Sequence, residues 1–259
     1  MLTAKIFGVG APIVLLPGFR LDADAMAAMF EPVFTRAAGR QRIYLDLPGT
    51  GGSAPVKPTS DAVLDSVQET VLGLTGDGPL LVVGHSYGGY LAAGLARRLP
   101  GRIGGLLLIC SGVKIERGDR NLSGISSPAP EPGWLADVPT ELHDHFDQAI
   151  GHQRRAVATR LAEVLALRGP MQEEYLALLQ SDGYRLSDEG SVQVFEGRVR
   201  IVAGRRDRIG GYLDQFDALS RYPRGDFVLV GEAGHYLPLE QPGILAANAL
   251  DWLGGEEPE

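Results

Sequence analysis

The feature that most constrains the fold is a serine between two glycines, placed where an apolar run gives way to a helical pattern. The apolar run covers residues 80–83, the helical pattern covers residues 90–99, and the sequence GHSYG at residues 84–88 lies between them. So tight a turn from strand to helix leaves no room for side chains two residues before or after the serine. The pattern therefore predicts that Ser86 is held in a strained backbone conformation, with its hydroxyl above the end of the strand.

Strand-like and helix-like patterns alternate along the rest of the chain. Short apolar runs bounded by glycine, proline or charged residues occur at residues 4–7, 12–16, 42–47, 103–110, 198–203 and 226–230. Such an alternation is typical of an α/β fold, with a mostly parallel central sheet and helices on both faces. The runs at 4–7 and 12–16 are close together in sequence, and we expect them to form a first pair of strands.

The alternation is interrupted in the middle of the chain. Residues 113–133 are rich in glycine, serine, proline and charge. Three helical patterns follow with no strand between them, at residues 138–150, 153–167 and 171–180. A run of helices inside a strand–helix alternation indicates an insertion at one sheet edge. We therefore predict a core formed by residues 1–112 and 197–259, with residues 113–196 inserted as a helical cap.

Charge and composition exclude several classes of partner. The 259 residues include 24 Lys and Arg against 32 Asp and Glu, a net charge of −8, with no basic cluster. Because nucleic-acid binding depends on neutralising phosphates, we expect no nucleic-acid partner. No segment approaches the ~20 consecutive apolar residues of a membrane span, and no signal peptide is evident. The single cysteine, Cys110, cannot form an internal disulfide, and we expect a buried thiol in a cytoplasmic protein.

Two further reactive side chains follow later strand-like runs. Asp207 comes after the run at 198–203, and His235 comes after the run at 226–230 in a loop that contains Gly234. A serine hydroxyl is a weak nucleophile until an imidazole takes its proton, and a carboxylate fixes that imidazole. Because ligands of such sheets bind at the carboxyl ends of the strands, the order Ser86, Asp207, His235 predicts a nucleophile, an acid and a base.

The remaining candidates have less reactive interpretations. Asp46 also ends a strand-like run, but in a glycine-rich loop where its carboxylate is expected to accept backbone hydrogen bonds. His85 should point away from the neighbouring serine and pack in the core. His143, His145 and His152 lie in the predicted cap without a regular set of metal ligands, and we expect a solvated helix face there and no metal site.

On these residues the chain resembles the α/β-hydrolase superfamily over essentially its whole length. The motifs that carry the resemblance are LLPGF at 15–19, DLPGTGGS at 46–53, GHSYGG at 84–89, AGRRD at 203–207 and GEAGHYLPLEQP at 231–242. The resemblance implies that Ser86 is the nucleophile, His235 the general base and Asp207 the acid that orients it.

The resemblance also implies an oxyanion hole made of the backbone N–H groups of Phe19 and Tyr87. The Tyr87 N–H lies at the start of a helix, where the helix dipole favours a developing negative charge. Many members of the superfamily have His-Gly before the first of these residues, whereas this chain has Pro17-Gly18. Because the contact is made by the backbone, we expect the hole to form nevertheless.

The activity implied is that of a serine hydrolase acting through an acyl-enzyme on a small or medium-sized ester, thioester or related carbonyl compound. No metal or organic cofactor is needed, and the partner is a small-molecule substrate. Arg20, Arg120, Trp134 and Ile209 are candidates to line its pocket. A serine at the tight turn argues against the dehalogenase and epoxide-hydrolase branches, which have aspartate there.

Other activities remain open from the sequence. The same three residues could cleave a carbon–carbon bond, as in the similar meta-cleavage product hydrolases, or act as in a hydroxynitrile lyase. A protein that binds a ligand on this fold without turnover is a third alternative. The sequence leaves open whether the protein is a monomer or a homodimer.

Overall fold

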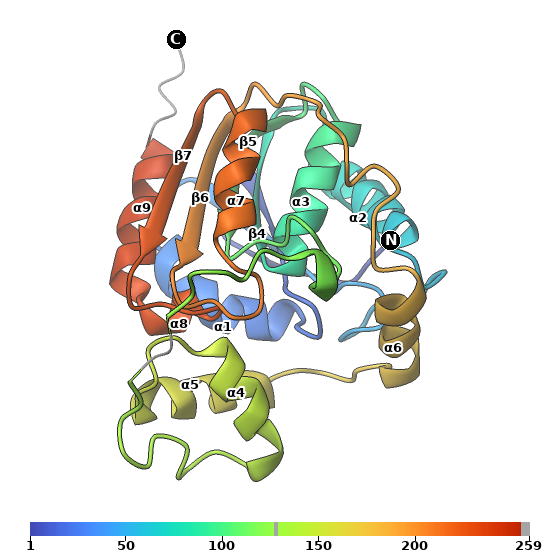
Figure 1. The fold of residues 1–259 in the computed structure, drawn as a ribbon. Coiled ribbons are helices and arrows are strands. Elements are labelled where there is room, and N and C mark those ends of the chain that lie inside the picture. The colour runs from blue at the N-terminus through green and yellow to red at the C-terminus, as the bar shows by residue number, and fades with distance from the viewer. Residues whose placement is uncertain (127–128, 255–259) are drawn as a thin grey trace.

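The computed structural model describes residues 1–126 and 129–254, and within them the chain forms one seven-stranded sheet of order β1-β3-β2-β4-β5-β6-β7 (Figure 1). The strands are β1 (Ala4–Phe7), β2 (Ala11–Leu16), β3 (Arg40–Leu45), β4 (Leu80–His85), β5 (Ile103–Ile109), β6 (Arg198–Gly204) and β7 (Gly225–Val230). All neighbouring strands are parallel except β1, which runs antiparallel to β3. The predicted fold class is confirmed.

The first two strands are not a pair, and that expectation was wrong. β3 lies between β1 and β2 and pairs with both. The turn before β2 explains the arrangement: Gly10 has a φ of +122°, and a Cβ there would lie 1.9 Å from the Gly39 carbonyl oxygen. The Ala11 N–H donates to that same carbonyl at 3.0 Å. The start of β2 is thereby held against the start of β3, and β1 is left at the edge.

Helices cover both faces of the sheet. Helices α1 (Ala23–Phe34) and α9 (Pro242–Gly254) pack on one face, and α2 (Ser60–Leu74) and α3 (Tyr87–Arg98) pack on the other. Successive side chains of a strand point to opposite faces. In β4, Leu81 and Val83 accordingly join the apolar core with α1, whereas Leu80 and Val82 join the core with α2 and α3.

Short helices complete the α/β core. They are α7 (Leu213–Asp217), α8 (Leu237–Glu240) and the 3-10 helix η3 (Ala218–Arg221). None of the helices in the described part of the chain is long and apolar enough to cross a membrane.

The segment between β5 and β6 contains helices and loops. Its helices are η1 (Arg117–Asp119), η2 (Thr140–Leu142), α4 (His143–Ala149), α5 (Arg155–Ala166) and α6 (Glu173–Asp182). β5 and β6 are neighbours inside the sheet, so the expected position at a sheet edge was wrong. In Figure 1, α4 and α5 lie beyond the arrowheads of β6 and β7, over the carboxyl ends of the strands. We call residues 113–196 the inserted segment.

Candidate active site

The turn from β4 to α3 has the geometry that the glycines predict. Ser86 lies between them with φ 53° and ψ −119°, a conformation that residues with a Cβ rarely adopt. A Cβ at Gly84 would lie 2.5 Å from the Gly88 carbonyl oxygen, and a Cβ at Gly88 would lie 2.0 Å from the Leu16 carbonyl oxygen. Backbone therefore fills the space on both sides of the serine, and the prediction of a strained, glycine-dependent turn is confirmed.

The structure brings Ser86, His235 and Asp207 together in one hydrogen-bonded row. Ser86 Oγ lies 2.8 Å from His235 Nε2, and His235 Nδ1 lies 2.9 Å from Asp207 Oδ2. The other Asp207 oxygen accepts the N–H groups of Ile209 at 2.9 Å and Gly210 at 2.8 Å, and the Asp207 side chain is fully buried. With Nδ1 donating to the carboxylate, Nε2 is left as the acceptor for the serine proton.

Asp46, the other aspartate considered at the end of a strand, has a structural role. One of its oxygens accepts the Ala23 N–H at the start of α1, and the other accepts the Gly52 N–H, both at 2.8 Å. These two bonds tie the glycine-rich loop to α1. The expectation that Asp46 hydrogen-bonds backbone groups is confirmed.

The two backbone groups expected to form an anion site lie beside the serine. A Cβ at Gly18 would lie 3.3 Å from Ser86 Cβ, which places the Pro17-Gly18-Phe19 loop against the nucleophile. Tyr87 is the first residue of α3, so its N–H has no acceptor within the helix. Among the hydrogen bonds of the described residues, neither the Phe19 nor the Tyr87 N–H has a partner. Both N–H groups are free to bind a negatively charged oxygen.

His85 is buried, as predicted, and it also supports the base. Its Nε2–H donates to the His235 carbonyl oxygen at 2.9 Å, and the two rings are 5.2 Å apart. Burial lowers the pKa of His85 to about 3, so the ring is neutral. The sequence did not indicate this contact, which helps to fix the backbone of His235.

Glu240 is a second supporting residue that the sequence did not single out, although it lies within the GEAGHYLPLEQP motif. Its Oε2 accepts the N–H groups of Gly151 at 2.8 Å, His152 at 2.7 Å and Gly234 at 2.9 Å. The His235 N–H donates to the Ala149 carbonyl at 2.7 Å. The loop that carries His235 is therefore joined to the end of α4 and the turn after it by one backbone hydrogen bond and by the Glu240 carboxylate.

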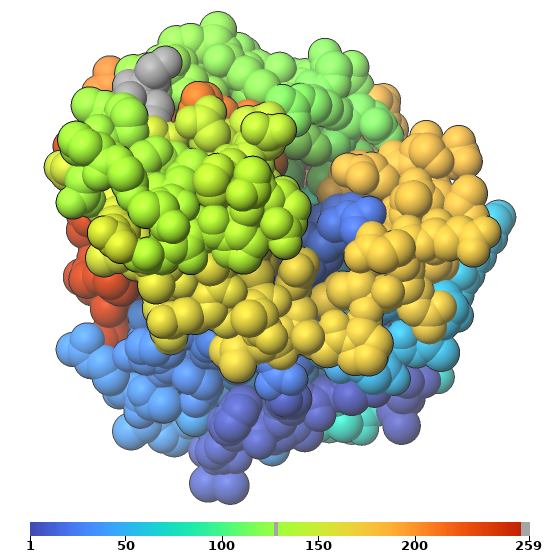
Figure 2. All heavy atoms as spheres, turned by 90° about the horizontal axis from the view of Figure 1, so that it is seen from below, coloured from blue at the N-terminus to red at the C-terminus, as the bar shows by residue number. Residues whose placement is uncertain are grey.

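A cavity of about 450 Å³ opens above the serine. Its floor includes Ser86, His235 and Phe19, and its walls include residues of the inserted segment. Figure 2 views the molecule from the side of that segment and shows a hollow between the yellow-green and gold parts of the chain, with blue N-terminal residues at its bottom. A cavity of this size is typical of sites for small molecules.

Three of the four residues expected to line the pocket do so. Arg20, Arg120 and Ile209 border the cavity. Trp134 does not border it, because its side chain is only 8% exposed and belongs to the same apolar core as Val138. The structure thus uses this large apolar side chain to stabilise the inserted segment.

The histidines of the inserted segment differ from one another. His143 Nε2 lies 2.9 Å from the Val138 carbonyl oxygen. His145 is exposed, borders the cavity, and has its Nε2 3.1 Å from the hydroxyl of Tyr236. Among the described residues, no group of three or more His, Cys, Asp or Glu side chains could hold a metal ion. Cys110 is buried with a free thiol, as predicted.

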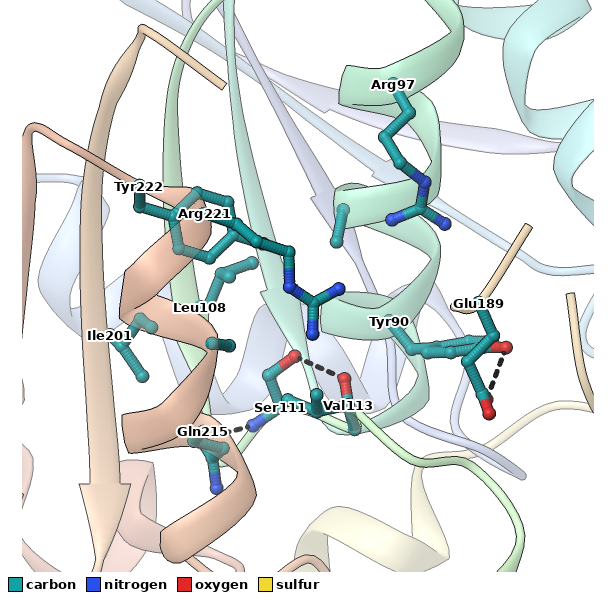
Figure 3. A pocket seen from close by; sticks show the side chains of 13 residues that line it. Tyr90, Arg97, Leu108, Ser111, Val113, Glu189, Ile201, Gln215, Arg221 and Tyr222 are labelled. Carbon is teal, nitrogen blue, oxygen red and sulfur yellow. Dashed lines mark hydrogen bonds between the residues drawn. The ribbon is translucent and has the colours of Figure 1, made fainter. Parts of the chain in front are cut away.

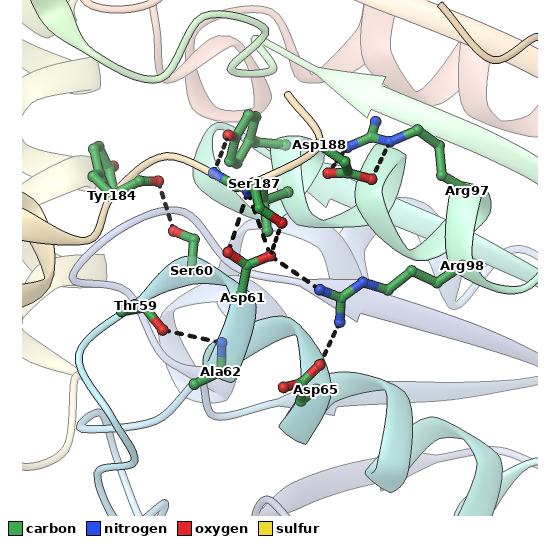
Figure 4. A network of polar contacts seen from close by, with 12 residues as sticks. Thr59, Ser60, Asp61, Ala62, Asp65, Arg97, Arg98, Tyr184, Ser187 and Asp188 are labelled. Carbon is green, nitrogen blue, oxygen red and sulfur yellow. Dashed lines mark hydrogen bonds and ion pairs between the residues drawn. The ribbon is translucent and has the colours of Figure 1, made fainter. Parts of the chain in front are cut away.

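A polar network fixes the end of the inserted segment to α2 and α3 (Figure 4). Ser60 Oγ donates to the Tyr184 carbonyl at 2.6 Å, and the Asp61 carboxylate accepts the Ser187 N–H at 3.1 Å. Arg97 forms two bonds of 2.7 Å to the carboxylate of Asp188. Because Tyr184 borders the cavity, this network also sets the position of one cavity wall.

A smaller cavity lies between α3 and α7 (Figure 3). Its volume is about 20 Å³, and its lining includes Tyr90, Gln215 and Arg221. That volume suits about one water molecule. It contains none of the three residues of the hydrogen-bonded row, and we assign it no substrate.

Comparisons with known proteins agree with the fold and the motifs. A sequence model described as "Alpha/beta hydrolase family" matches residues 13–248. The dihydrolipoyllysine-residue acetyltransferase component of an acetoin cleaving system from Pseudomonas putida is 37% identical, over 94% of this chain but 64% of that protein, so the chain spans less than two thirds of it. Lipase LipV of Mycobacterium tuberculosis is 33% identical, over 81% of this chain and 82% of the lipase. The crystal structure of an alpha/beta superfamily hydrolase from Oenococcus oeni superposes with a TM-score of 0.76 at 26% identity, over 97% of this chain and 96% of that one.

Proposed function

The chain belongs to the alpha/beta hydrolase family, and on that premise we propose that it is a serine hydrolase that cleaves an ester, thioester or related carbonyl substrate through an acyl-enzyme. The observation that carries the proposal is the row of hydrogen bonds from Ser86 through His235 to Asp207, at 2.8 and 2.9 Å, on the floor of the cavity. Ester hydrolysis is the expected class ahead of carbon–carbon bond cleavage.

In the acylation step, His235 Nε2 takes the proton of Ser86 as Oγ attacks the carbonyl carbon. The buried Asp207 carboxylate stabilises the imidazolium that forms. The carbonyl oxygen becomes negatively charged and is bound by the N–H groups of Phe19 and Tyr87. His235 then gives the proton to the leaving alcohol or thiol, and the acyl group remains on the serine.

In the deacylation step, water enters the position that the leaving group has vacated. His235 Nε2 takes a proton from this water as its oxygen attacks the acyl carbon. Collapse of the second tetrahedral intermediate returns the proton to Ser86 Oγ and releases the carboxylic acid. The cycle uses no metal or organic cofactor.

The inserted segment supports a substrate of small to medium size. We propose that residues 113–196 act as a cap and that residues 1–112 and 197–259 form the catalytic core. Leu142 and Leu165 add apolar surface to the cavity, which suits a partly apolar acyl group. We also propose a cytoplasmic location and a small-molecule substrate as the partner.

Covalent labelling of the serine tests the proposal directly. A fluorophosphonate should modify the folded wild-type protein at Ser86 and should not modify Ser86→Ala. Ser111→Ala is the matched control, because Ser111 is also a buried serine but its Oγ donates to the Gly112 carbonyl at 3.0 Å. The control should label like the wild type. An unmodified Ser86 in folded wild-type protein would refute the hydrolase proposal.

A panel of p-nitrophenyl esters of increasing chain length then separates the alternatives. Turnover of these esters that is lost in Ser86→Ala supports the hydrolase. Release of cyanide from a cyanohydrin without ester turnover would instead indicate lyase chemistry. Cleavage of a vinylogous 1,5-diketone without ester turnover would indicate a carbon–carbon hydrolase. Ligand binding that is unchanged in Ser86→Ala, with no turnover in the wild type, would indicate a binding protein.

A further inference from the structure

The wall of the main cavity has the opposite charge to the protein as a whole. The chain carries a net charge of −8. Four arginines border the cavity against one carboxylate, Glu116; they are Arg20, Arg117, Arg120 and Arg168. A cavity lined by one sign of charge concentrates ligands of the other sign.

Arg120 is held by backbone carbonyls on three sides. Its Nη1 donates to the Ile209 carbonyl at 2.8 Å, its Nε donates to the Lys114 carbonyl at 3.2 Å, and its Nη2 donates to the Ile115 carbonyl. A guanidinium has five N–H groups. Two of them are left without an acceptor among the described residues.

The position of Arg120 is coupled to the catalytic row. The N–H of Ile209 donates to the carboxylate of Asp207, and the carbonyl of Ile209 accepts from Arg120. The guanidinium is therefore fixed relative to the serine before any substrate arrives. Fixed donors lose little entropy on binding, and a planar guanidinium suits carboxylate or phosphate oxygens.

Arg168 is held in the same manner from the inserted segment. Its Nε donates to the Leu165 carbonyl at 2.9 Å, and its Nη1 donates to the Arg20 carbonyl at 3.0 Å. None of the ion pairs among the described residues includes Arg120 or Arg168. Arg97, outside this cavity, shows the contrast, since both of its bonds to Asp188 are made to a carboxylate.

Carbonyl oxygens orient a guanidinium but do not neutralise it. The positive charge of an arginine that is paired with a carboxylate is neutralised within the protein. The charges of Arg120 and Arg168 at the cavity wall are not neutralised in this way. Charge-assisted bonds to an anion are stronger than bonds between neutral groups. Both arginines are thus ready to bind an anionic group of a molecule whose carbonyl lies above Ser86.

We propose that the substrate of this site carries an anionic group, a carboxylate or a phosphate, apart from the bond that is cleaved, and that Arg120 and Arg168 bind it. This inference rests on the proposed function, since it describes the molecule that Ser86 attacks. It narrows the substrate from any small ester or thioester to one with a charged end.

A binding experiment tests the inference without turnover. Calorimetry with the Ser86→Ala protein compares monomethyl glutarate, which is anionic, with dimethyl glutarate, which is neutral and of similar size. The phosphate arm uses methyl 4-phosphonobutanoate. We expect at least one anionic ester to bind about tenfold or more tightly than dimethyl glutarate, with a preference that falls as salt is raised. The tighter of the two anions identifies the group.

Variants then test the two arginines. Arg120→Gln and Arg168→Gln should each lower the preference for the anionic ester, whereas Arg120→Lys should retain part of it because the charge is kept. The matched control is Arg155→Gln, since Arg155 belongs to the inserted segment but is exposed and paired with Asp137. The control should bind all three esters like the parent protein.

The same comparison can be made by kinetics in the wild type, as the ratio of kcat/KM for mono-p-nitrophenyl glutarate to that for p-nitrophenyl pentanoate. If Ser86→Ala binds neither anionic ester more tightly than dimethyl glutarate, the inference is overturned. That result would stand even if a fluorophosphonate labels Ser86 in the wild-type protein. Tighter binding of an anionic ester would support it even if the wild type turned over no ester, in which case only the proposed hydrolysis would fail. A preference unchanged in both glutamine variants would also overturn it.

Discussion

The turn at residues 84–88 and the inserted segment both shape the candidate site, but different forces hold them. In the turn, glycine is required because backbone atoms of Leu16 and Gly88 occupy the space of any side chain. The inserted segment is held by polar contacts, among them side-chain oxygens that accept backbone N–H groups. Glu240 binds Gly151 and His152, and Asp22 binds Gly169 at 2.6 Å.

The difference teaches which part of the site is fixed and which part can vary. A substitution in the turn moves the nucleophile, because nothing there can give way. A substitution on the cavity side of the inserted segment changes only what the substrate meets, as long as the polar anchors remain. Chemistry and specificity are thus assigned to separate parts of the chain, and variants in the two parts should differ accordingly.

The largest expected effect is on the chemical step. Asp207→Asn keeps the shape of the side chain but removes the charge that orients and stabilises His235, so kcat should fall by roughly 10⁴-fold. Asp46→Asn is the control, because the Asp46 carboxylate accepts the backbone N–H groups of Ala23 and Gly52 and lies outside the hydrogen-bonded row. Steady-state hydrolysis of a p-nitrophenyl ester measures both. A loss of kcat in Asp46→Asn as large as in Asp207→Asn would show that the acid has been assigned wrongly.

The next largest effect is on the free energy of unfolding, for which a glycine variant in the turn can be compared with one in the inserted segment. Gly88→Ala would place a Cβ 2.0 Å from the Leu16 carbonyl oxygen, and we expect it to lower the free energy of unfolding by about 3 kcal/mol or more. Gly190→Ala, in the inserted segment, meets nothing within 4 Å and should change it by less than about 0.5 kcal/mol. Urea unfolding followed by circular dichroism measures both. Equal stabilities would show that the turn relaxes more easily than its geometry implies.

The same contrast explains what the sequence could predict. The turn was predictable because a side chain at either of its glycines would clash with nearby backbone atoms. The positions of Asp207 and His235 followed from the rule that such groups come after parallel strands. The sheet order was not fully predictable, since β3 separates two strands that are adjacent in sequence.

The cavity walls were the least predictable part of the site. His145 and Trp134 both lie in the inserted segment, yet His145 borders the cavity and Trp134 is in the core. Which side chains of the inserted segment face the substrate depends on how the segment packs, and that packing is set by distant residues such as Glu240. The local pattern around either residue contains no such information.

The anchor at Glu240 should make stability depend on pH. Burial raises the pKa of Glu240 from 4.5 to about 7 in the folded protein. The folded state therefore binds more protons than the unfolded state between these values. The contribution of Glu240 makes the free energy of unfolding fall as pH rises from about 4.5 to about 7, by up to about 3 kcal/mol.

Glu240→Gln keeps one oxygen to accept the three N–H groups but cannot ionise. Its stability should consequently fall less than that of the wild type between pH 5 and pH 8, as measured by urea unfolding at both values. Asp188→Asn is the matched control, because pairing with Arg97 lowers the pKa of Asp188 from 3.8 and its contribution to stability is therefore constant between pH 5 and pH 8. If the wild type and Glu240→Gln show the same difference between the two pH values, Glu240 does not titrate in this range.

The smallest effect is expected where the inserted segment meets solvent. Arg155 and Asp137 form an ion pair in which both side chains are about half exposed. Water and salt screen such a pair, so Arg155→Gln should change the free energy of unfolding by less than about 0.5 kcal/mol and leave kcat/KM for a neutral ester unchanged. Urea unfolding and ester hydrolysis check the two values. A large loss of stability would mean that surface charge, and not the buried anchors at Glu240 and Asp22, holds the inserted segment over the site. The turn would then differ from the inserted segment as backbone packing differs from surface ion pairing.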